Sequence, residues 1–250
     1  MRYEPWFQQC GTPSMTTIHE TVYEMPDRGG AERPGRATER DYAAFVTAQT
    51  DIVAPPLVPE IKLHLASSPR GIFVAADRFM DSGLGARPYW AYAWPGGQGL
   101  ARFILDHPDV VRGKRVVDIG AGSGISSIAC GMAGAASVLA ADIDPIATAA
   151  AALNATINGV AIDVTTRDLL GCDLDADLVI IGDLVYEPDL KIRVAAVIDT
   201  ALAAGVRVLY GDRTSARRPP HAFHLLREYE APLTPPLVED FIERARVWQL

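Results

Sequence analysis

A glycine-rich segment from Asp118 to Gly124, with the sequence Asp-Ile-Gly-Ala-Gly-Ser-Gly, has the residue types and spacing of a ligand-binding loop. Glycine adopts positive φ angles without strain and lets a ligand approach the backbone closely. A helix that starts after such a loop presents unpaired N–H groups to an anion. The dinucleotide fingerprint G-x-G-x-x-G fails here, because Ile125 or Ser127 occupies the third glycine position. The segment therefore predicts a cofactor site and disfavours a nicotinamide dehydrogenase.

The remaining pattern, Asp-x-Gly-x-Gly-x-Gly, resembles the first motif of the class I S-adenosylmethionine (SAM)-dependent methyltransferases. The resemblance implies that this loop binds the amino-acid end of SAM. It implies cofactor-binding roles for Asp118, Gly120, Gly122 and Gly124. The alternative is a glycine-rich turn that binds no ligand.

Three acids after the next two expected strands extend the site. Asp142 follows the glycine loop by about 20 residues, the distance at which a strand-end carboxylate binds the ribose hydroxyls in dinucleotide folds. Asp144 precedes Pro145 and is better suited to cap the next helix. Asp168 matches the position that binds the adenine amino group in the methyltransferases. Asp142 could instead be a solvated strand-end acid, and Asp168 a plain loop acid.

The fourth expected strand ends in Ile-Gly-Asp-Leu-Val-Tyr at 181–186, where class I methyltransferases place the groups that bind the methyl acceptor. The Pro-Pro pair of enzymes that methylate amino groups of nucleic acids or glutamine is missing. Asp183-x-x-Tyr186 resembles the motif of a group of protein-lysine methyltransferases. The resemblance implies catalytic roles for Asp183 and Tyr186, with Gly182 beside the cofactor. The alternative is a strand-end acid and a packed tyrosine.

Further segments resemble one subfamily of that group, which methylates lysines of the electron-transfer flavoprotein β-subunit. The segments are Pro-Tyr-Trp-Ala-Tyr-Ala-Trp-Pro-Gly-Gly at 88–97, Tyr-Gly-Asp-Arg at 210–213 and Val-Trp-Gln-Leu at 247–250. The resemblance covers roughly residues 52–250 and implies that Trp94 and Gly96 contact the cofactor, that SAM is the cofactor and that the flavoprotein β-subunit is the protein partner. Arg213 departs from the Gly-Asp-Pro form often found there. Trp94 could also be a core residue, the role expected for Trp90 and Tyr92.

The implied reaction is in-line attack of a neutral lysine amine on the methyl carbon of SAM. A free lysine has a pKa of about 10.4, so the amine must lose a proton before it reacts. Desolvation by aromatic walls, to which Tyr186 and Trp94 would contribute, lowers the lysine pKa. A carboxylate has the opposite effect, so we expect Asp183 to orient the amine rather than to act as a strong base.

The elements that position these residues follow from the apolar pattern. Short apolar runs alternate with helical stretches from residue 114 onward, which predicts a parallel sheet covered on both faces. Ligands of such sheets bind at the carboxyl ends of the strands, where the candidate residues lie. The expected fold is α/β, with a Rossmann-like, mostly parallel seven-stranded sheet and an N-terminal helical cap. The expected strands are 114–119, 136–143, 162–166, 176–181 and 206–210, and the expected helices are 99–106, 126–133, 145–158 and 190–203.

The two ends of the chain carry weaker patterns. Residues 1–40 are polar and aperiodic, so we expect a mobile extension there and a single methyltransferase domain at 41–250. A short helix is expected near 41–50 and a helical turn at 60–66. The stretch 221–229 favours a helix, and 239–250 favours either a strand pair or a helix followed by a strand.

Composition excludes several classes of protein. The formal net charge of −8 disfavours general nucleic-acid binding, which depends on Lys and Arg. The three cysteines are far apart in sequence and the histidines are dispersed, so we expect neither a disulfide framework nor a metal site. No apolar run is long enough for a membrane helix and no signal peptide stands at the N-terminus, so a cytoplasmic protein is expected.

The sequence leaves other functions open. The same cofactor loop would serve a methyltransferase of another protein, such as a ribosomal protein, or of a small-molecule amine. A SAM-binding protein without catalysis is a third alternative, which the intact Asp183 and Tyr186 disfavour.

Overall fold

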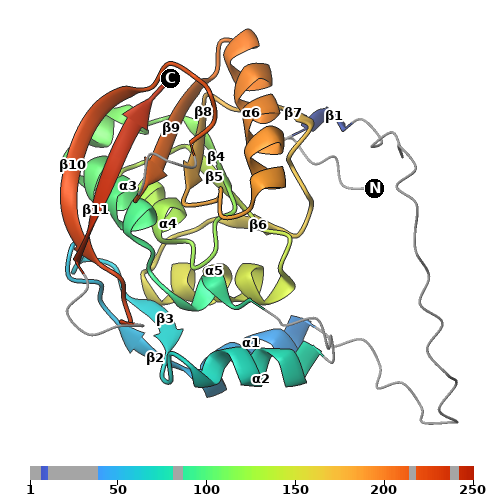
Figure 1. Ribbon diagram of the computed structural model, residues 1–250, viewed down its shortest axis with the longest axis vertical. Helices are drawn as coiled ribbons and strands as arrows, with labels where there is room; N and C mark the ends of the chain where they lie inside the picture. Colours follow the sequence, from blue (N-terminus) through green and yellow to red (C-terminus); the bar gives the residue numbers. More distant parts are fainter. Residues whose placement is uncertain (1–6, 11–38, 81–86, 214–217, 237–241) are drawn as a thin grey trace, which may run out of the picture.

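A computed structural model describes residues 7–10, 39–80, 87–213, 218–236 and 242–250. Its centre is a seven-stranded sheet with the strand order β10-β11-β9-β8-β4-β5-β6 (Figure 1). The five parallel strands are β4 (Arg115–Ile119), β5 (Ser137–Ala141), β6 (Asp163–Thr165), β8 (Leu178–Gly182) and β9 (Arg207–Asp212). The antiparallel strands are β11 (Ile242–Gln249) and β10 (His224–Pro232). The Rossmann-like, mostly parallel seven-stranded sheet is confirmed.

Helices cover both faces of this sheet. The helices α3 (Pro95–Asp106) and α4 (Ile125–Met132) pack with Val116 and Ile180 in one apolar cluster. The helix α6 (Pro188–Ala203) packs with Val117 and Val179 in a second cluster. Since successive side chains of a strand point to opposite faces, the central strands β4, β5, β8 and β9 contribute to both clusters. This two-sided burial explains why these central strands are largely apolar without alternation.

The N-terminal part of the domain forms a cap on α5 (Pro145–Ile157), at the bottom of Figure 1. It consists of α1 (Glu39–Gln49), β2 (Thr50–Val53), β3 (Leu63–Ala66), α2 (Gly71–Met80) and the short 3₁₀ helix η1 (Tyr89–Ala91). The expected cap and its first helix are confirmed.

The expected helical turn at 60–66 is wrong, because residues 63–66 form strand β3 instead. This strand pairs with β2 in an antiparallel ladder. Asn154 of α5 and Asn158, the residue that caps its C-terminus, bind the backbone in and just before β3: Asn154 Oδ1 accepts the N–H of His64 at 2.7 Å, and Asn158 Oδ1 accepts the N–H of Lys62 at 2.9 Å. These long-range partners hold the segment extended.

The described part of the N-terminal extension is a strand. Strand β1 (Phe7–Cys10) pairs with β7 (Cys172–Leu174) in a small antiparallel sheet, so the expectation of a mobile segment is wrong for these four residues. Residues 11–38, most of the remaining extension, lie outside the described residues. Cys172 is disulfide-bonded, although the spacing of the cysteines predicts no disulfide framework, and Cys130 is a buried free thiol.

The C-terminal residues complete the sheet. The helix expected at 221–229 is wrong, because most of that stretch belongs to strand β10, which pairs with β11 along its whole length. In β11, Ala245 and Val247 are fully buried against α3 and the core. Partner strands distant in sequence therefore override the local helical pattern. Within the described ranges, no helix is long and apolar enough to cross a membrane.

Candidate active site

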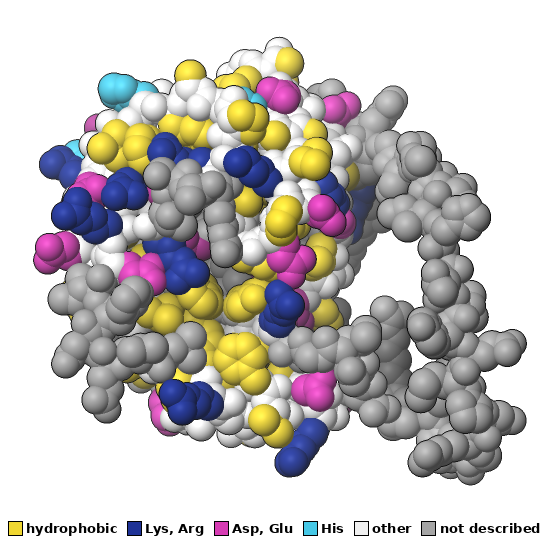
Figure 2. Space-filling view, in the orientation of Figure 1, with side chains coloured by type: hydrophobic (Ala, Val, Ile, Leu, Met, Phe, Trp, Pro, Cys, Tyr) yellow, Lys and Arg dark blue, Asp and Glu magenta, His cyan; other side chains and the backbone are white. Residues whose placement is uncertain are grey.

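A cavity of about 640 Å³ opens at the carboxyl ends of β4, β5 and β8 and extends to the cap. On the face in Figure 2, apolar side chains gather around the hollow, and charged side chains lie at its sides. The strand ends bring together the glycine loop, Asp142, Asp168, Gly182, Asp183 and Tyr186, and the segment before α3 adds Trp94. Most of the residues singled out in the sequence therefore line one cavity.

The glycine loop leaves β4 through three residues with positive φ: Gly120 (+70°), Gly122 (+53°) and Gly124 (+77°). A Cβ at Gly120 would lie 2.5 Å from Leu184 Cδ1, so the loop packs against the segment that follows β8. Gly120 and Gly122 line the cavity. Gly124 lies behind it and begins α4 in the left-handed conformation, with a Cβ position 3.0 Å from Ala151. It shapes the loop from outside the cavity.

Asp118 is a buried acid at the base of the cavity. The Ser127 hydroxyl of α4 donates a hydrogen bond to its Oδ2 at 2.7 Å. Burial raises the pKa of Asp118 to about 6, and the nearby Asp142 carboxylate acts in the same direction. The side chain is therefore fixed in a place where it would respond to a positive charge in the cavity.

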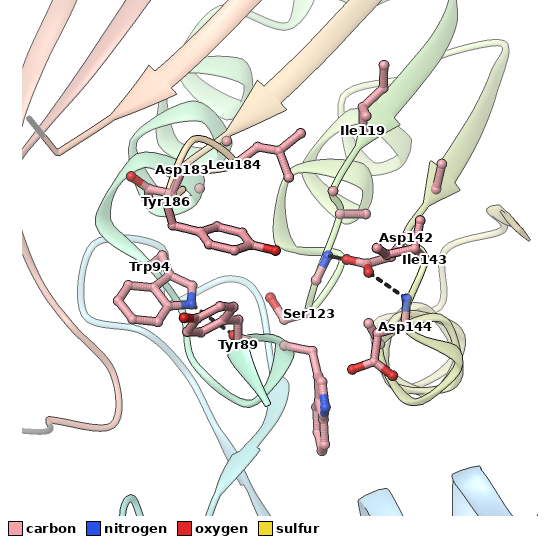
Figure 3. Close-up of a pocket in the computed structure, with 18 of the residues that line it drawn as sticks. Tyr89, Trp94, Ile119, Ser123, Asp142, Ile143, Asp144, Asp183, Leu184 and Tyr186 are labelled. Carbon is pink, nitrogen blue, oxygen red and sulfur yellow. Dashed lines mark hydrogen bonds between the residues drawn. The ribbon is translucent and has the colours of Figure 1, made fainter. Parts of the chain in front are cut away.

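Asp142 stands at the end of β5 with both carboxylate oxygens oriented by backbone (Figure 3). The N–H of Gly122 donates to Oδ2 at 2.9 Å, and the N–H of Asp144 donates to Oδ1 at 3.0 Å. Burial raises its pKa. Asp144 caps α5 by accepting the N–H of Ile146 at 2.8 Å, so its predicted capping role is confirmed. Burial raises the pKa of Asp144 to about 6.

Asp168 lines the cavity on the loop between β6 and β7, next to Leu169 and Leu170. Its Oδ2 pairs with Arg193 of α6 at 2.6 Å, and its Oδ1 accepts the N–H of Leu170 at 3.0 Å. The side chain is 44% exposed, so this pair is open to water. Asp168 therefore reaches the cavity as half of a surface ion pair.

Asp183 follows β8 with a φ of +47°, in the left-handed region that residues other than glycine adopt uncommonly, Asn and Asp more often than most. Its N–H donates to the carbonyl of Gly211 at 2.9 Å, and its Oδ2 accepts the N–H of Gly96 at 2.6 Å. Burial raises its pKa to about 7, although the Gly96 N–H and the Arg213 charge oppose that shift. The fold thus holds an acid here that changes charge near neutral pH.

The Trp-Pro-Gly-Gly segment explains how α3 approaches the strand ends so closely. A Cβ on Gly96 would lie 2.6 Å from Asp183 Oδ2, and a Cβ on Gly211 would lie 2.5 Å from the Gly96 carbonyl. Gly96 does not line the cavity; it supports Asp183 from behind. Trp94 lines the cavity, partly buried, and its Nε1 donates to the Tyr89 carbonyl at 2.8 Å. Trp90 and Tyr92 are 2% and 1% exposed, as expected of core residues.

Three aromatic side chains form one end of the cavity (Figure 3). The ring centroids of Tyr89 and Tyr186 lie 4.8 Å apart, and those of Tyr89 and Trp94 lie 5.8 Å apart. Tyr186 is 36% exposed, and burial of its hydroxyl raises its pKa. Asp142 and Asp144 lie at the opposite end, with Ser123 between the two groups.

Sequence reasoning missed several residues of this site. Tyr89 is a main part of the aromatic wall, and the density of aromatic residues at 88–94 was the signal that could have indicated it. Arg213 lines the cavity and lies over Trp94, with 5.2 Å between the guanidinium carbon and the ring centroid. Its only signal was the departure from Gly-Asp-Pro. Leu184, which contacts the glycine loop, carried no signal at all.

The arrangement suits transfer of a group between two bound molecules. One end offers an acidic, backbone-lined cradle, and the other offers a carboxyl group beside aromatic rings. In the part of the chain that the structure describes, no group of three His, Cys, Asp or Glu side chains could hold a metal ion.

Comparisons with known proteins place this chain in a family. The electron transfer flavoprotein beta subunit lysine methyltransferase of Rattus norvegicus is 38% identical over 208 residues, which is 79% of this chain and 80% of the rat protein. The Homo sapiens protein of the same name is 41% identical over 172 residues, covering 67% of this chain and 62% of the human protein.

A shorter likeness connects the chain with another group of methyltransferases. The family model for ribosomal protein L11 methyltransferase (PrmA) matches residues 103–186. The ribosomal protein L11 methyltransferase of Symbiobacterium thermophilum is 48% identical over 91 residues, 34% of this chain and 30% of that protein. The longer matches decide between the two: the chain is a methyltransferase and belongs to the electron transfer flavoprotein beta subunit lysine methyltransferase family.

Proposed function

We propose that this enzyme transfers the methyl group of SAM to lysine side chains of the electron-transfer flavoprotein β-subunit. The observation that carries the proposal is that Asp183 and Tyr186 face the same cavity as the glycine loop and Asp142. A cofactor and a methyl acceptor could therefore bind side by side in one continuous cavity. The names of the relatives that match most of the chain support the choice of protein substrate.

The cofactor end fits SAM in shape and charge. Glycines with positive φ leave room beside the backbone, and the cavity volume lies within the usual range for cofactor pockets. Asp118 and the glycine loop would hold the amino-acid end, Asp142 the ribose, and Asp168 with Leu169 the adenine. The acids there accept hydrogen bonds from backbone N–H groups and Ser127, so a cationic ligand suits them. When bound, SAM supplies an electrophilic methyl group on a positively charged sulfur.

The acceptor end must bind a lysine amine, orient it and favour its neutral form. The rings of Tyr89, Tyr186 and Trp94 remove water from around the amine, which lowers the lysine pKa. Asp183 has one oxygen engaged by the Gly96 N–H, which leaves Oδ1 to accept a hydrogen bond from the amine and direct its lone pair. Positioning of the two reactants then supplies much of the rate.

The raised pKa of Asp183 makes it easier for the substrate lysine to lose the proton that it must lose before it reacts. An ordinary aspartate, with a pKa near 3.8, holds a proton far less strongly than a lysine of pKa about 10.4. At a pKa of about 7, Asp183 is a better proton acceptor and less firmly negative. Its role therefore extends from orienting the amine to receiving its proton on the way to water.

A cytoplasmic location stays a prediction from the sequence.

The test is a methylation assay with defined acceptors. The purified chain is incubated with methyl-labelled SAM and, in separate reactions, the flavoprotein β-subunit, ribosomal protein L11 and a small primary amine. We expect label on a lysine of the β-subunit, located by mass spectrometry, and none with Asp183→Asn. Label on L11 or the small amine alone would refute the proposed substrate. SAM binding without transfer to any acceptor would refute the proposal that the protein methylates lysine.

A further inference from the structure

Arg213 lies at the acceptor end of the cavity, between an aromatic ring and a carboxylate. It follows β9 directly, and its guanidinium carbon lies 5.2 Å from the centroid of Trp94. Its Nη1 lies 3.1 Å from Oε1 of Glu243 in β11. The Glu243 side chain is 14% exposed and the Arg213 side chain 37%, so water screens this ion pair only from the arginine side. A fixed positive charge therefore borders the space where a lysine amine would bind.

The charges around Asp183 come from three elements. From α3, the Gly96 N–H donates to its Oδ2; from the end of β9 come Arg213 and Asp212; from β11 comes Glu243. Tyr210, also in β9, is a buried phenol whose pKa is raised mainly by burial and also by Asp212 and Asp183.

Both neighbouring acids have an arginine partner. Asp212 lies 3.1 Å from Arg218 and accepts the Trp248 Nε1–H at 3.1 Å, while Glu243 pairs with Arg213. Asp183 itself accepts a hydrogen bond from a neutral group, the Gly96 N–H. The described charges at this end therefore balance pairwise, except for the carboxyl group that faces the acceptor.

This balance matters because a lysine reacts only as the neutral amine. Every uncompensated negative charge near the amine stabilises its ammonium form, and every positive charge opposes it. Without Arg213, Glu243 would become an uncompensated, partly buried anion close to Asp183. The acceptor site would then hold a lysine cation tightly in its unreactive state.

We propose that Arg213, paired with Glu243, is a positioning residue that limits the negative charge of the acceptor site and so favours the neutral, reactive form of the substrate lysine. This inference rests on the proposed lysine methylation. Arg213 acts through the electric field at the amine and through its contact with Trp94, and it makes no bond with the methyl group.

The test is the pH dependence of kcat at saturating SAM and flavoprotein β-subunit for four variants, because kcat reports the ionisation of groups in the enzyme–substrate complex. Arg213→Met removes the charge, and we expect the acidic limb of the pH profile to move upward by about one pH unit. At pH values below the limb, the rate should then be roughly tenfold lower than that of the wild type, and at high pH the two rates should be equal. Arg213→Lys keeps the charge and should leave the limb near its original place. Glu243→Gln should move the limb downward, and the double variant Arg213→Met with Glu243→Gln should return it towards the wild-type position.

A second measurement reads the charge balance without catalysis. In the unliganded protein labelled with ¹³C at aspartate carboxyl groups, NMR titration should show a higher pKa for Asp183 in Arg213→Met and a lower one in Glu243→Gln. Rates that fall equally at all pH values, with an unmoved Asp183 titration, would overturn the inference and leave Arg213 a merely structural role. Wild-type enzyme that methylates no lysine would refute the proposed function instead, and the titration would still decide whether Arg213 controls Asp183.

Discussion

The two ends of the cavity are built in different ways. Most of the cofactor end comes from continuous chain, in which β4, the glycine loop, α4 and the end of β5 follow one another between residues 115 and 144; the loop after β6 adds Asp168 and Leu169. The acceptor end combines segments at 89–97, 182–186, 211–213 and 243, which meet only because α3 packs on the ends of β8 and β9. Local backbone geometry therefore determines the first end, and tertiary packing determines the second.

The electrostatics of the two ends differ in the same way. At the cofactor end, Asp142 and Asp144 accept backbone N–H groups, which suits a ligand that brings its own positive charge. At the acceptor end, Asp212 and Glu243 are paired with arginines, which suits a ligand that must lose its charge. Substitutions at the cofactor end should therefore change the affinity for SAM, and substitutions at the acceptor end should change the rate of methyl transfer.

Asp183→Asn should show the largest effect. Asparagine tolerates the φ of +47° and can still accept the Gly96 N–H, so the fold should persist. It cannot receive a proton, and we expect kcat to fall by about a hundredfold or more. The Kd for SAM, measured by calorimetry, should stay within about twofold of wild type. A near wild-type rate would remove Asp183 from the reaction, and a large loss of SAM affinity would contradict the separation of the two ends.

Asp142→Asn should give the opposite result. The amide cannot supply two charged acceptor oxygens, so we expect SAM to bind about ten to a hundredfold more weakly, as calorimetry would measure. At saturating SAM, kcat should change little. Asp168→Asn is the matched control, because Asp168 is 44% exposed and already paired with Arg193, so a smaller effect is expected. Equal effects of the two substitutions would contradict the special role of Asp142.

The difference between the ends also explains what the sequence could predict. The glycine loop, Asp142 and the Asp144 cap depend on spacing along a few turns of chain, and the structure brings them together as expected. Asp183 and Tyr186 could be assigned because Asp-x-x-Tyr after the fourth expected strand resembles a motif of protein-lysine methyltransferases. The parallel strands follow from the alternation of apolar runs with helices, whereas their order on the sheet is known only from the structure.

The rest depends on partners that are distant in sequence. Nothing near Arg213 indicates that it lies over Trp94 or pairs with Glu243. The supporting role of Gly96 becomes visible only when its N–H meets Asp183. The strands β3 and β10 were mistaken for helical segments because their ladders and amide contacts come from remote segments.

Gly120→Ala should couple the two ends, because Gly120 in the cofactor loop contacts Leu184 in the acceptor loop. An added Cβ would lie 2.5 Å from Leu184 Cδ1 and would impose strain at a φ of +70°. We expect a loss of about 2–4 kcal/mol of unfolding free energy, measured by urea denaturation, together with weaker SAM binding and slower turnover.

Gly113→Ala is the matched control for that substitution. Gly113 has a φ of +68° and nothing within 4 Å of its Cβ position, so it isolates the backbone strain of about 1–2 kcal/mol. The excess loss in Gly120→Ala then measures the contact between the two loops. If both variants lose the same stability and retain activity, the cofactor loop and the acceptor loop are independent.

The smallest effect should be the pH dependence of stability caused by Asp183. Its pKa of about 7 in the folded protein exceeds the unfolded value of about 3.9, so the folded state binds more protons between these values. Stability is therefore lost as the pH rises through this window, and the loss is complete above pH 7. Asn at this position does not titrate, so the melting temperature of Asp183→Asn relative to wild type should rise by a few degrees between pH 5 and pH 8. Because Asp118 and Asp144 titrate in both proteins, their contributions cancel in this difference. A difference in melting temperature that stays constant with pH would show that Asp183 ionises like an ordinary carboxyl group, and the acceptor end would then lack the proton acceptor that distinguishes it from the cofactor end.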